Sequence, residues 1–126
     1  MRIQENLEKS KYEADGKISI QGTTIPYHTI CEDHFFVDEE NNPVASIFSY
    51  AYFRSDIQDN SKRPILFIYN GGPGCASLWL HMGLFGPRIV KLDDELNLPT
   101  VPPFELEDNP HCLLDLCDLV FIDPVG

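Results

Sequence analysis

The sequence predicts an α/β protein with a mixed sheet: an antiparallel front meander, then a strand, a turn, a helix and another strand. Two observations carry this prediction. The stretch 17–54 alternates apolar and polar residues around two turn signals, as hairpin strands do. Two short apolar runs, 64–69 and 119–122, flank a helix-like segment and read as buried strands.

The front meander follows from its turns and its alternation. Residues 17–30 form the first expected hairpin, which turns at Gln21-Gly22, and residues 40–43 form a second turn. The strand after residue 43 has two faces, one carrying Ala45, Ile47, Ser49, Ala51 and Phe53, the other Ser46, Phe48, Tyr50 and Tyr52. Residues 1–16 are polar and are expected to form a disordered arm, which leaves 17–126 as one folded portion.

The second half is expected to build the centre of the sheet. Residues 64–69 are apolar on both faces, which predicts a central strand covered on both sides. Residues 75–85 predict a short buried helix ended by Gly86-Pro87, and residues 92–110 a surface excursion. Residues 119–122 predict a second central strand. No helix follows it before Gly126, so we expect an incomplete sheet that exposes apolar area.

Composition excludes several classes of function. The chain has 126 residues and a formal net charge of −11, which argues against a nucleic-acid partner because phosphate binding needs clustered Lys and Arg. No window reaches the length of a membrane span, so no membrane partner is expected. The start shows no secretory signal, which predicts a cytoplasmic location, or a periplasmic or secreted one if the N-terminus was trimmed. The four cysteines are too few and scattered for a disulfide scaffold.

The turn Asn70-Gly71-Gly72-Pro73-Gly74 is the strongest candidate for chemistry. A strand that enters a helix through small residues directs free backbone N–H groups at the turn, and the absence of Cβ lets another atom approach closely. Pro73 fixes φ and removes one donor. The local residues leave three interpretations open: a tight turn for packing, an oxyanion hole, or a phosphate site. The phosphate interpretation is weakest, because no Lys follows Gly74 and no third glycine completes a dinucleotide motif.

The residues around this turn resemble a known family. The stretch NGGPGCAS between an apolar strand and a helix, together with GLFGPRIV and NPHCLLDLCDLVFIDPVG, is similar to the serine carboxypeptidase family, peptidase family S10 of α/β-hydrolase fold. The front segment is similar to bacterial members in particular. The resemblance covers residues 17–126.

The resemblance implies roles for individual residues. Asn70 would help to hold the carboxylate of the substrate's C-terminus, with the amide of Gly71 nearby, and the N–H of Gly72 would form part of the oxyanion hole. The alternative for Asn70 is a strand-end Asn that bonds its own turn. Cys75 matches a disulfide position of some secreted members and is expected to be a free thiol. Leu84 stands where some members carry an acid, which puts their preference for acidic pH in doubt.

The chain lacks the rest of a serine-protease site. None of its seven serines lies in a G-x-S-x-G elbow, and Ser77, the nearest, is flanked by Cys75 and Trp79. Trp79 and Phe85 are expected in the core. A Cys75–His81 pair is disfavoured because their spacing does not share a helix face. On a helix His28, Cys31 and His34 would form a metal face, but a strand places Cys31 opposite the two histidines. His111, Cys112 and Cys117 are expected in the core, and no metal or cofactor is expected.

The sequence thus predicts an N-terminal portion of a serine-type carboxypeptidase that is inactive alone and whose partner is the C-terminus of a peptide. Two alternatives remain open. One is an esterase or aminopeptidase of the same fold. The other is a non-catalytic protein that binds a partner or self-associates through its incomplete sheet.

Overall fold

A computed structural model describes residues 2–3, 10–72 and 74–125. The main sheet contains six strands: β1 (Arg2–Ile3), β2 (Lys11–Ile20), β3 (Thr23–Val37), β4 (Pro43–Arg54), β5 (Ile65–Tyr69) and β8 (Asp118–Asp123). The strands β6 (Arg88–Val90) and β7 (Leu106–Asp108) form a separate two-stranded sheet. The helical segments are short: η1 (Asn60–Lys62), α1 (Leu78–Leu80) and η2 (His81–Phe85), the last with π-helical bonding.

The first hairpin is confirmed. Gln21 and Gly22 both have positive φ, 50° and 80°, the combination that a two-residue hairpin turn needs to match the twist of its strands. The polar arm is shorter than expected, because residues 11–16 belong to β2. They are held by pairing with the long strand β3, from Lys11 opposite Glu32 to Gly16 opposite Tyr27. Of the remaining arm, residues 4–9 lie outside the described part of the chain.

The second turn is also confirmed. The carboxylate of Asp38 accepts hydrogen bonds from the backbone N–H groups of Glu40 and Asn42, both at 2.9 Å, and Asn41 has a φ of 66°. Such a side-chain-closed turn is typical of Asp and Asn. The turn sets the antiparallel register of β3 and β4, which runs from Tyr27 opposite Arg54 to Val37 opposite Pro43.

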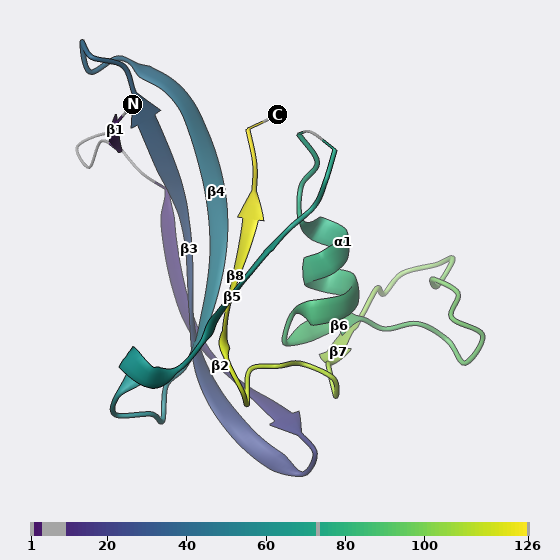
Figure 1. The fold of residues 1–126 in the computed structure, drawn as a ribbon. Coiled ribbons are helices and arrows are strands. Elements are labelled where there is room, and N and C mark those ends of the chain that lie inside the picture. Colours follow the sequence, from purple (N-terminus) through teal and green to yellow (C-terminus); the bar gives the residue numbers. More distant parts are fainter. Residues whose placement is uncertain (1, 4–9, 73, 126) are drawn as a thin grey trace.

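The two apolar runs of the second half become parallel neighbours. β8 lies inside the sheet, antiparallel to β4 and parallel to β5, which confirms 119–122 as a central strand. The expectation for 64–69 is wrong in one respect, because β5 is an outer strand with only one covered face. Ile68 is buried, whereas Phe67 and Tyr69 are 58% and 66% exposed. The helical segment that begins with α1 lies on one side of the sheet (Figure 1).

The helix predicted over 75–85 forms as α1 followed by η2, and it is buried on one side only. Leu80 and Phe85 pack against the core, so the expectation for Phe85 is confirmed. Trp79 is 71% exposed, and its predicted core position is wrong because it lines an open hollow between α1 and the stretch 89–98. Gly86 ends η2 at a corner where an added Cβ would collide with the His81 carbonyl.

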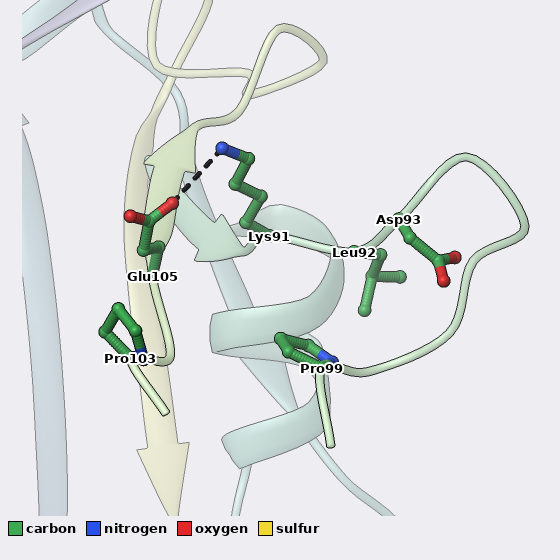
Figure 2. Close-up of a pocket in the computed structure, with 6 residues that line it drawn as sticks. All are labelled: Lys91, Leu92, Asp93, Pro99, Pro103 and Glu105. Carbon is green, nitrogen blue, oxygen red and sulfur yellow. Dashed lines mark hydrogen bonds and ion pairs between the residues drawn. The ribbon is translucent and has the colours of Figure 1, made fainter. Parts of the chain in front are cut away.

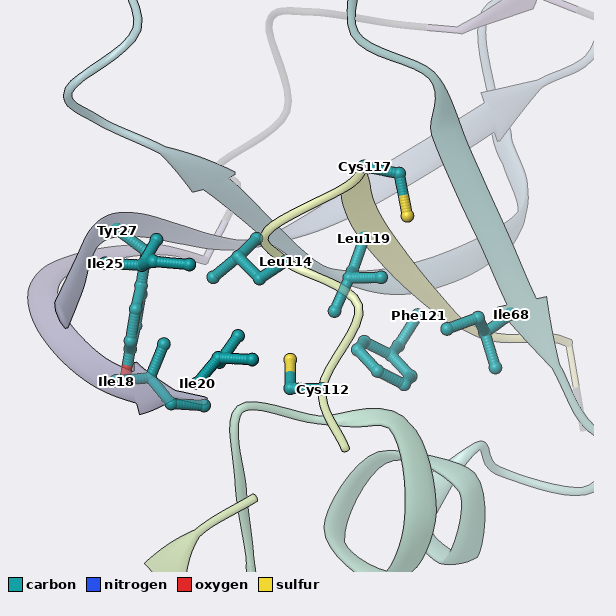
Figure 3. Packing of buried hydrophobic residues seen from close by; sticks show 10 residues of the cluster. All are labelled: Ile18, Ile20, Ile25, Tyr27, Ile68, Cys112, Leu114, Cys117, Leu119 and Phe121. Carbon is teal, nitrogen blue, oxygen red and sulfur yellow. The ribbon is translucent and has the colours of Figure 1, made fainter. Parts of the chain in front are cut away.

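The core lies between the first hairpin, β8, β5 and the turn 112–117 (Figure 3). Its ten buried members come from all four elements: Ile18, Ile20, Ile25, Tyr27, Ile68, Cys112, Leu114, Cys117, Leu119 and Phe121. Cys112 and Cys117 are therefore core residues as predicted, whereas His111 is exposed. The core fixes the position of β8 and thereby of the strand end beside the glycine turn.

The stretch after β6 is a surface excursion, as predicted. Figure 2 shows a hollow in this region, lined by Lys91, Leu92, Asp93, Pro99, Pro103 and Glu105. The ammonium group of Lys91 donates to Glu105 at 3.1 Å across the base of the excursion. No Ser, Cys or His lines this hollow.

Candidate functional site

The glycine turn lies where β5 ends, at the same edge of the sheet as the end of β8 (Figure 1). The two strands are parallel, with Tyr69 in register with Ile122, so their carboxyl ends meet there. In open sheets with parallel strands, ligands bind in the crevice outside these ends. The topology therefore places the predicted turn where a site is expected.

Asp123, the last residue of β8, anchors the chain just after the turn. One carboxylate oxygen of Asp123, Oδ1, accepts hydrogen bonds from the backbone N–H and from the hydroxyl of Ser77, at 2.7 and 2.8 Å. Ser77 is completely buried. The Ser77 carbonyl in turn accepts the N–H of His81 at 2.8 Å, which forms the first turn of α1.

Asn70 bonds within its own turn. Its side-chain Nδ2 donates to the Ala76 carbonyl at 3.0 Å and lies 3.5 Å from the Cys75 sulfur. This is the turn-bonding arrangement that the sequence left open beside a role in substrate binding. The bond to sulfur is the weaker of the two, because a thiol sulfur is a poor acceptor.

The three glycines of the turn, Gly71, Gly72 and Gly74, are open to solvent. Gly71 and Gly72 are exposed, and no acceptor within the described residues takes the N–H of Gly72. A Cβ on Gly72 would lie 3.1 Å from the Cβ of Cys75, so a side chain there would crowd the turn. Gly74 has a φ of 73°, a conformation that favours glycine. Pro73, expected to fix φ, lies outside the described residues.

His81 links the helical segment after the turn to the sheet. It is buried, and its Nε2 lies 2.6 Å from the hydroxyl of Tyr52 on β4. Its ring stacks on Phe121 of β8, with the ring centroids 4.4 Å apart. Burial lowers the pKa of His81 to about 4, partly offset by the Asp123 carboxylate. The imidazole is therefore neutral at pH 7 and ties α1 to the sheet.

Comparison with known proteins bears on the family. The chain is 32% identical over 90 residues to the pheromone-processing carboxypeptidase KEX1 of Saccharomyces cerevisiae (strain JAY291), and 31% identical over 77 residues to that of Komagataella phaffii. The chain belongs to the serine carboxypeptidase family. These matches cover 71% and 61% of this chain but only 11% of each relative. No protein-family model matches the sequence.

A solved carboxypeptidase contains a segment of similar fold. The crystal structure of Kex1(delta)p, a prohormone-processing carboxypeptidase from Saccharomyces cerevisiae, superposes with a TM-score of 0.51 and 25% identity. The match covers 73% of this chain and 19% of that one. The mixed sheet with few helices is thus that of a segment of a carboxypeptidase.

The position of Ser77 does not suit a nucleophile. In a serine carboxypeptidase the attacking hydroxyl has to reach a substrate carbonyl, whereas the Ser77 hydroxyl is sealed and donates to Asp123. Cys75 is a free, exposed thiol. His81, which the sequence considered as its partner, uses Nε2 for Tyr52 and is buried.

The other candidates from the sequence are dispersed. His28, Cys31 and His34 lie on β3, where alternation places Cys31 on the face opposite the histidines. His28 bonds Asp15 at 2.8 Å and His34 bonds Ser49 at 2.8 Å. Among the described residues no group of His, Cys, Asp or Glu is arranged to hold a metal ion. Within that same part of the chain no helix is long and apolar enough to cross a membrane.

Sequence reasoning missed Asp123 as a partner of the turn. The signal was present, because the acid stands at the end of the second apolar run, where parallel strands bring chain ends together. Asn109 was missed as well. It is buried, and its side chain donates to the carbonyls of Leu84 and Gly86 at 2.7 and 2.9 Å, which fixes the Gly86-Pro87 corner.

Proposed function

We propose that this chain is part of a serine-type carboxypeptidase of α/β-hydrolase fold, and that the turn 70–74 receives the C-terminal end of a peptide. The observation that carries the proposal is the exposed pair Gly71 and Gly72 at the carboxyl end of β5, with the Gly72 N–H unused within the described residues. Bare amides in this position suit a group that develops negative charge.

In the proposed reaction the peptide is cleaved through an acyl-enzyme. The Gly72 N–H stabilises the oxyanion of the tetrahedral intermediate, a contribution of about 3 kcal/mol for one donor of this kind. The nucleophile, its base and the orienting acid come from residues other than these 126, since no serine here has an elbow sequence. The chain alone is therefore expected to be inactive.

Asn70 is proposed to recognise the substrate's free carboxylate. Its bond to the Ala76 carbonyl orients the amide, and the N–H that faces the Cys75 sulfur at 3.5 Å is the one available to a better acceptor. A carboxylate oxygen accepts far more strongly than a thiol. The Gly71 amide, which is exposed beside it, supplies a second donor.

The test uses the 126-residue chain and a blocked dipeptide, N-acetyl-alanyl-leucine, with its C-terminal amide as the matched ligand. NMR of the labelled chain is expected to show shifts at the Gly71 and Gly72 amides with the acid and much smaller ones with the amide. Equal shifts with both ligands would favour an esterase or aminopeptidase of the same fold. Turnover of the acid by this chain, blocked by a serine-directed phosphonate, would overturn the assignment of the nucleophile.

We propose self-association through β5 as a second candidate, because the strand has an open edge and no charged residue. Natural sheets protect such edges with charge, as β2 does at the opposite side of this sheet with Lys11, Glu13, Asp15 and Lys17. Light scattering is expected to show dimers, and the Phe67→Lys variant is expected to be monomeric. A strict monomer at high concentration would exclude it.

The remaining predictions about partners stay proposals of the same kind. We propose that the partner is a peptide C-terminus, with neither nucleic acid nor membrane bound, and that the protein acts without a cofactor, in the cytoplasm or, if the N-terminus was trimmed, in the periplasm or outside the cell. The strongly acidic balance of −11 supports the exclusion of nucleic acid.

A further inference from the structure

We infer that Asp123 is a positioning residue that sets the geometry of the turn 70–74 through Ser77. The inference rests on the proposed function of that turn. Among the described residues Asp123 makes no hydrogen bond to Gly71, Gly72 or Gly74, and its two hydrogen bonds to the chain after the turn go to Ser77.

The bond between Asp123 and Ser77 is built to be rigid. A single oxygen, Oδ1, accepts two hydrogen bonds from one residue, at 2.7 and 2.8 Å, so Ser77 is held at both its backbone and its side chain. Bonds to an ionised acceptor are shorter and roughly twice as strong as neutral ones. Complete burial of Ser77 removes competing water and strengthens the hold.

The turn is clamped at two places. Upstream, the side chain of Asn70 donates to the Ala76 carbonyl at 3.0 Å. Downstream, the next residue, Ser77, is bound to β8 through Asp123. Gly71, Gly72 and Gly74 lie between, so the position of their amides relative to the sheet depends on both clamps. The Asn70 clamp is internal to the turn, and Asp123 supplies the one that reaches the neighbouring strand.

Asp123 lies outside the core of its strand. It is the last residue of β8 and half-buried, and the core members of that strand, Leu119 and Phe121, precede it. Burial raises the pKa of Tyr50 on β4 and lowers that of His81, and the Asp123 carboxylate adds a smaller upward contribution at both residues. Replacing the carboxylate by an amide of equal shape keeps the packing and removes the charge.

The experiment compares variants of the 126-residue chain by NMR, with Asp123→Asn as the main variant and Asp56→Asn as the control. Asp56 is an exposed carboxylate paired with Arg54, at the end of β4 that lies beside the start of β8. Asp123→Asn is expected to shift the Gly71, Gly72 and Gly74 amides and to weaken N-acetyl-alanyl-leucine binding about tenfold. The amides of β2 and β3, which do not pair with β8, are expected to stay unchanged, and Asp56→Asn to leave both the turn and the affinity unchanged.

Ser77 supplies an independent pair of variants. Ser77→Ala removes the hydroxyl bond and keeps the backbone bond, so a smaller displacement of the same glycine amides is expected, and Ser77→Thr is expected to restore it. If Asp123→Asn does not fold, the two Ser77 variants test the inference. Glycine amides that stay in place in Asp123→Asn, or in Ser77→Ala, overturn the inference. Displaced glycines in a chain whose unmodified form binds no dipeptide would uphold the clamp and refute the proposed function.

Discussion

The hydroxyl of Tyr52 and Nε2 of His81 share a 2.6 Å hydrogen bond, and this bond joins β4 to the helical segment behind the glycine turn. Both groups are neutral, because burial lowers the pKa of His81 to about 4 and raises that of Tyr52. His81 also stacks on Phe121, and its backbone N–H holds the Ser77 carbonyl. A single buried imidazole therefore connects three elements of the candidate site.

Stability is expected to fall as the pH drops from about 7 to 4. The pKa of His81 is about 4 in the folded chain and 6.5 when unfolded. Between these values the unfolded state binds the extra proton, so stability falls with falling pH, by on the order of 3 kcal/mol in total. Urea unfolding at pH 4.5 and 7.5 measures this. His81→Leu is expected to lose most of the difference, and an unchanged difference would show that His81 is not its source.

His28 is expected to titrate in the opposite direction. Its pKa is raised, chiefly by the hydrogen bond from Nδ1 to Asp15 at 2.8 Å. A raised pKa favours the folded chain below pH 6.5, and that contribution is lost as the pH rises through the folded value. NMR titration is expected to show a lower His28 pKa in Asp15→Asn and no change in Asp56→Asn. A His28 pKa that is unchanged in Asp15→Asn would contradict the pairing of His28 with Asp15.

Cys75 is expected to be the first thiol to react. It is exposed and free, whereas Cys112 and Cys117 are buried, and burial raises the pKa of the Cys112 thiol to about 11. The thiolate is the reactive form, so Cys75 should be labelled by iodoacetamide at pH 8 well before the buried pair. Peptide mass spectrometry identifies the sites. N-acetyl-alanyl-leucine is expected to slow the labelling, and prior labelling of Cys112 would rule out the described burial.

Asp118 is expected to be important for stability. Its carboxylate accepts from Arg63 Nε at 3.0 Å, with side chains only 7% and 11% exposed, and Arg63 also donates to the Leu114 carbonyl at 2.8 Å. Removing one partner of a buried pair leaves the other charge uncompensated, so Asp118→Ala should cost about 3 kcal/mol. Urea unfolding measures the loss. The exposed pair Arg88–Asp108 is the control, and Asp108→Ala is expected to cost under about 1 kcal/mol.

Local patterns predicted the parts of the fold that depend on neighbouring residues. Gln21-Gly22 and the turn 40–43 carry their own conformational signals, and the run 119–122 is short, β-branched and apolar. The same reasoning failed for β5 and Trp79, whose apolar character suggested cover on both sides. Apolar side chains indicate that a surface would be stabilised by burial, but they do not indicate which segment buries it.

The sequence predicted the glycines of the candidate site but not the residues that hold them in place. Gly71 and Gly72 are recognisable because their residue type permits close approach of a ligand. The link from Ser77 to Asp123 joins residues 46 apart in sequence and depends on β5 and β8 being parallel neighbours. Such pairs follow from topology, so a sequence read one stretch at a time does not show them.

The chain order of the sheet has a consequence for how the protein folds. Strands β2, β3 and β4 follow one another through tight turns, and their contacts form early because the loops that they close are short. β5 meets β8 only after about 50 residues have been closed into a loop, which carries a larger entropic cost. The meander is therefore expected to form before the pairing of β5 with β8, on which the shape of the glycine turn depends.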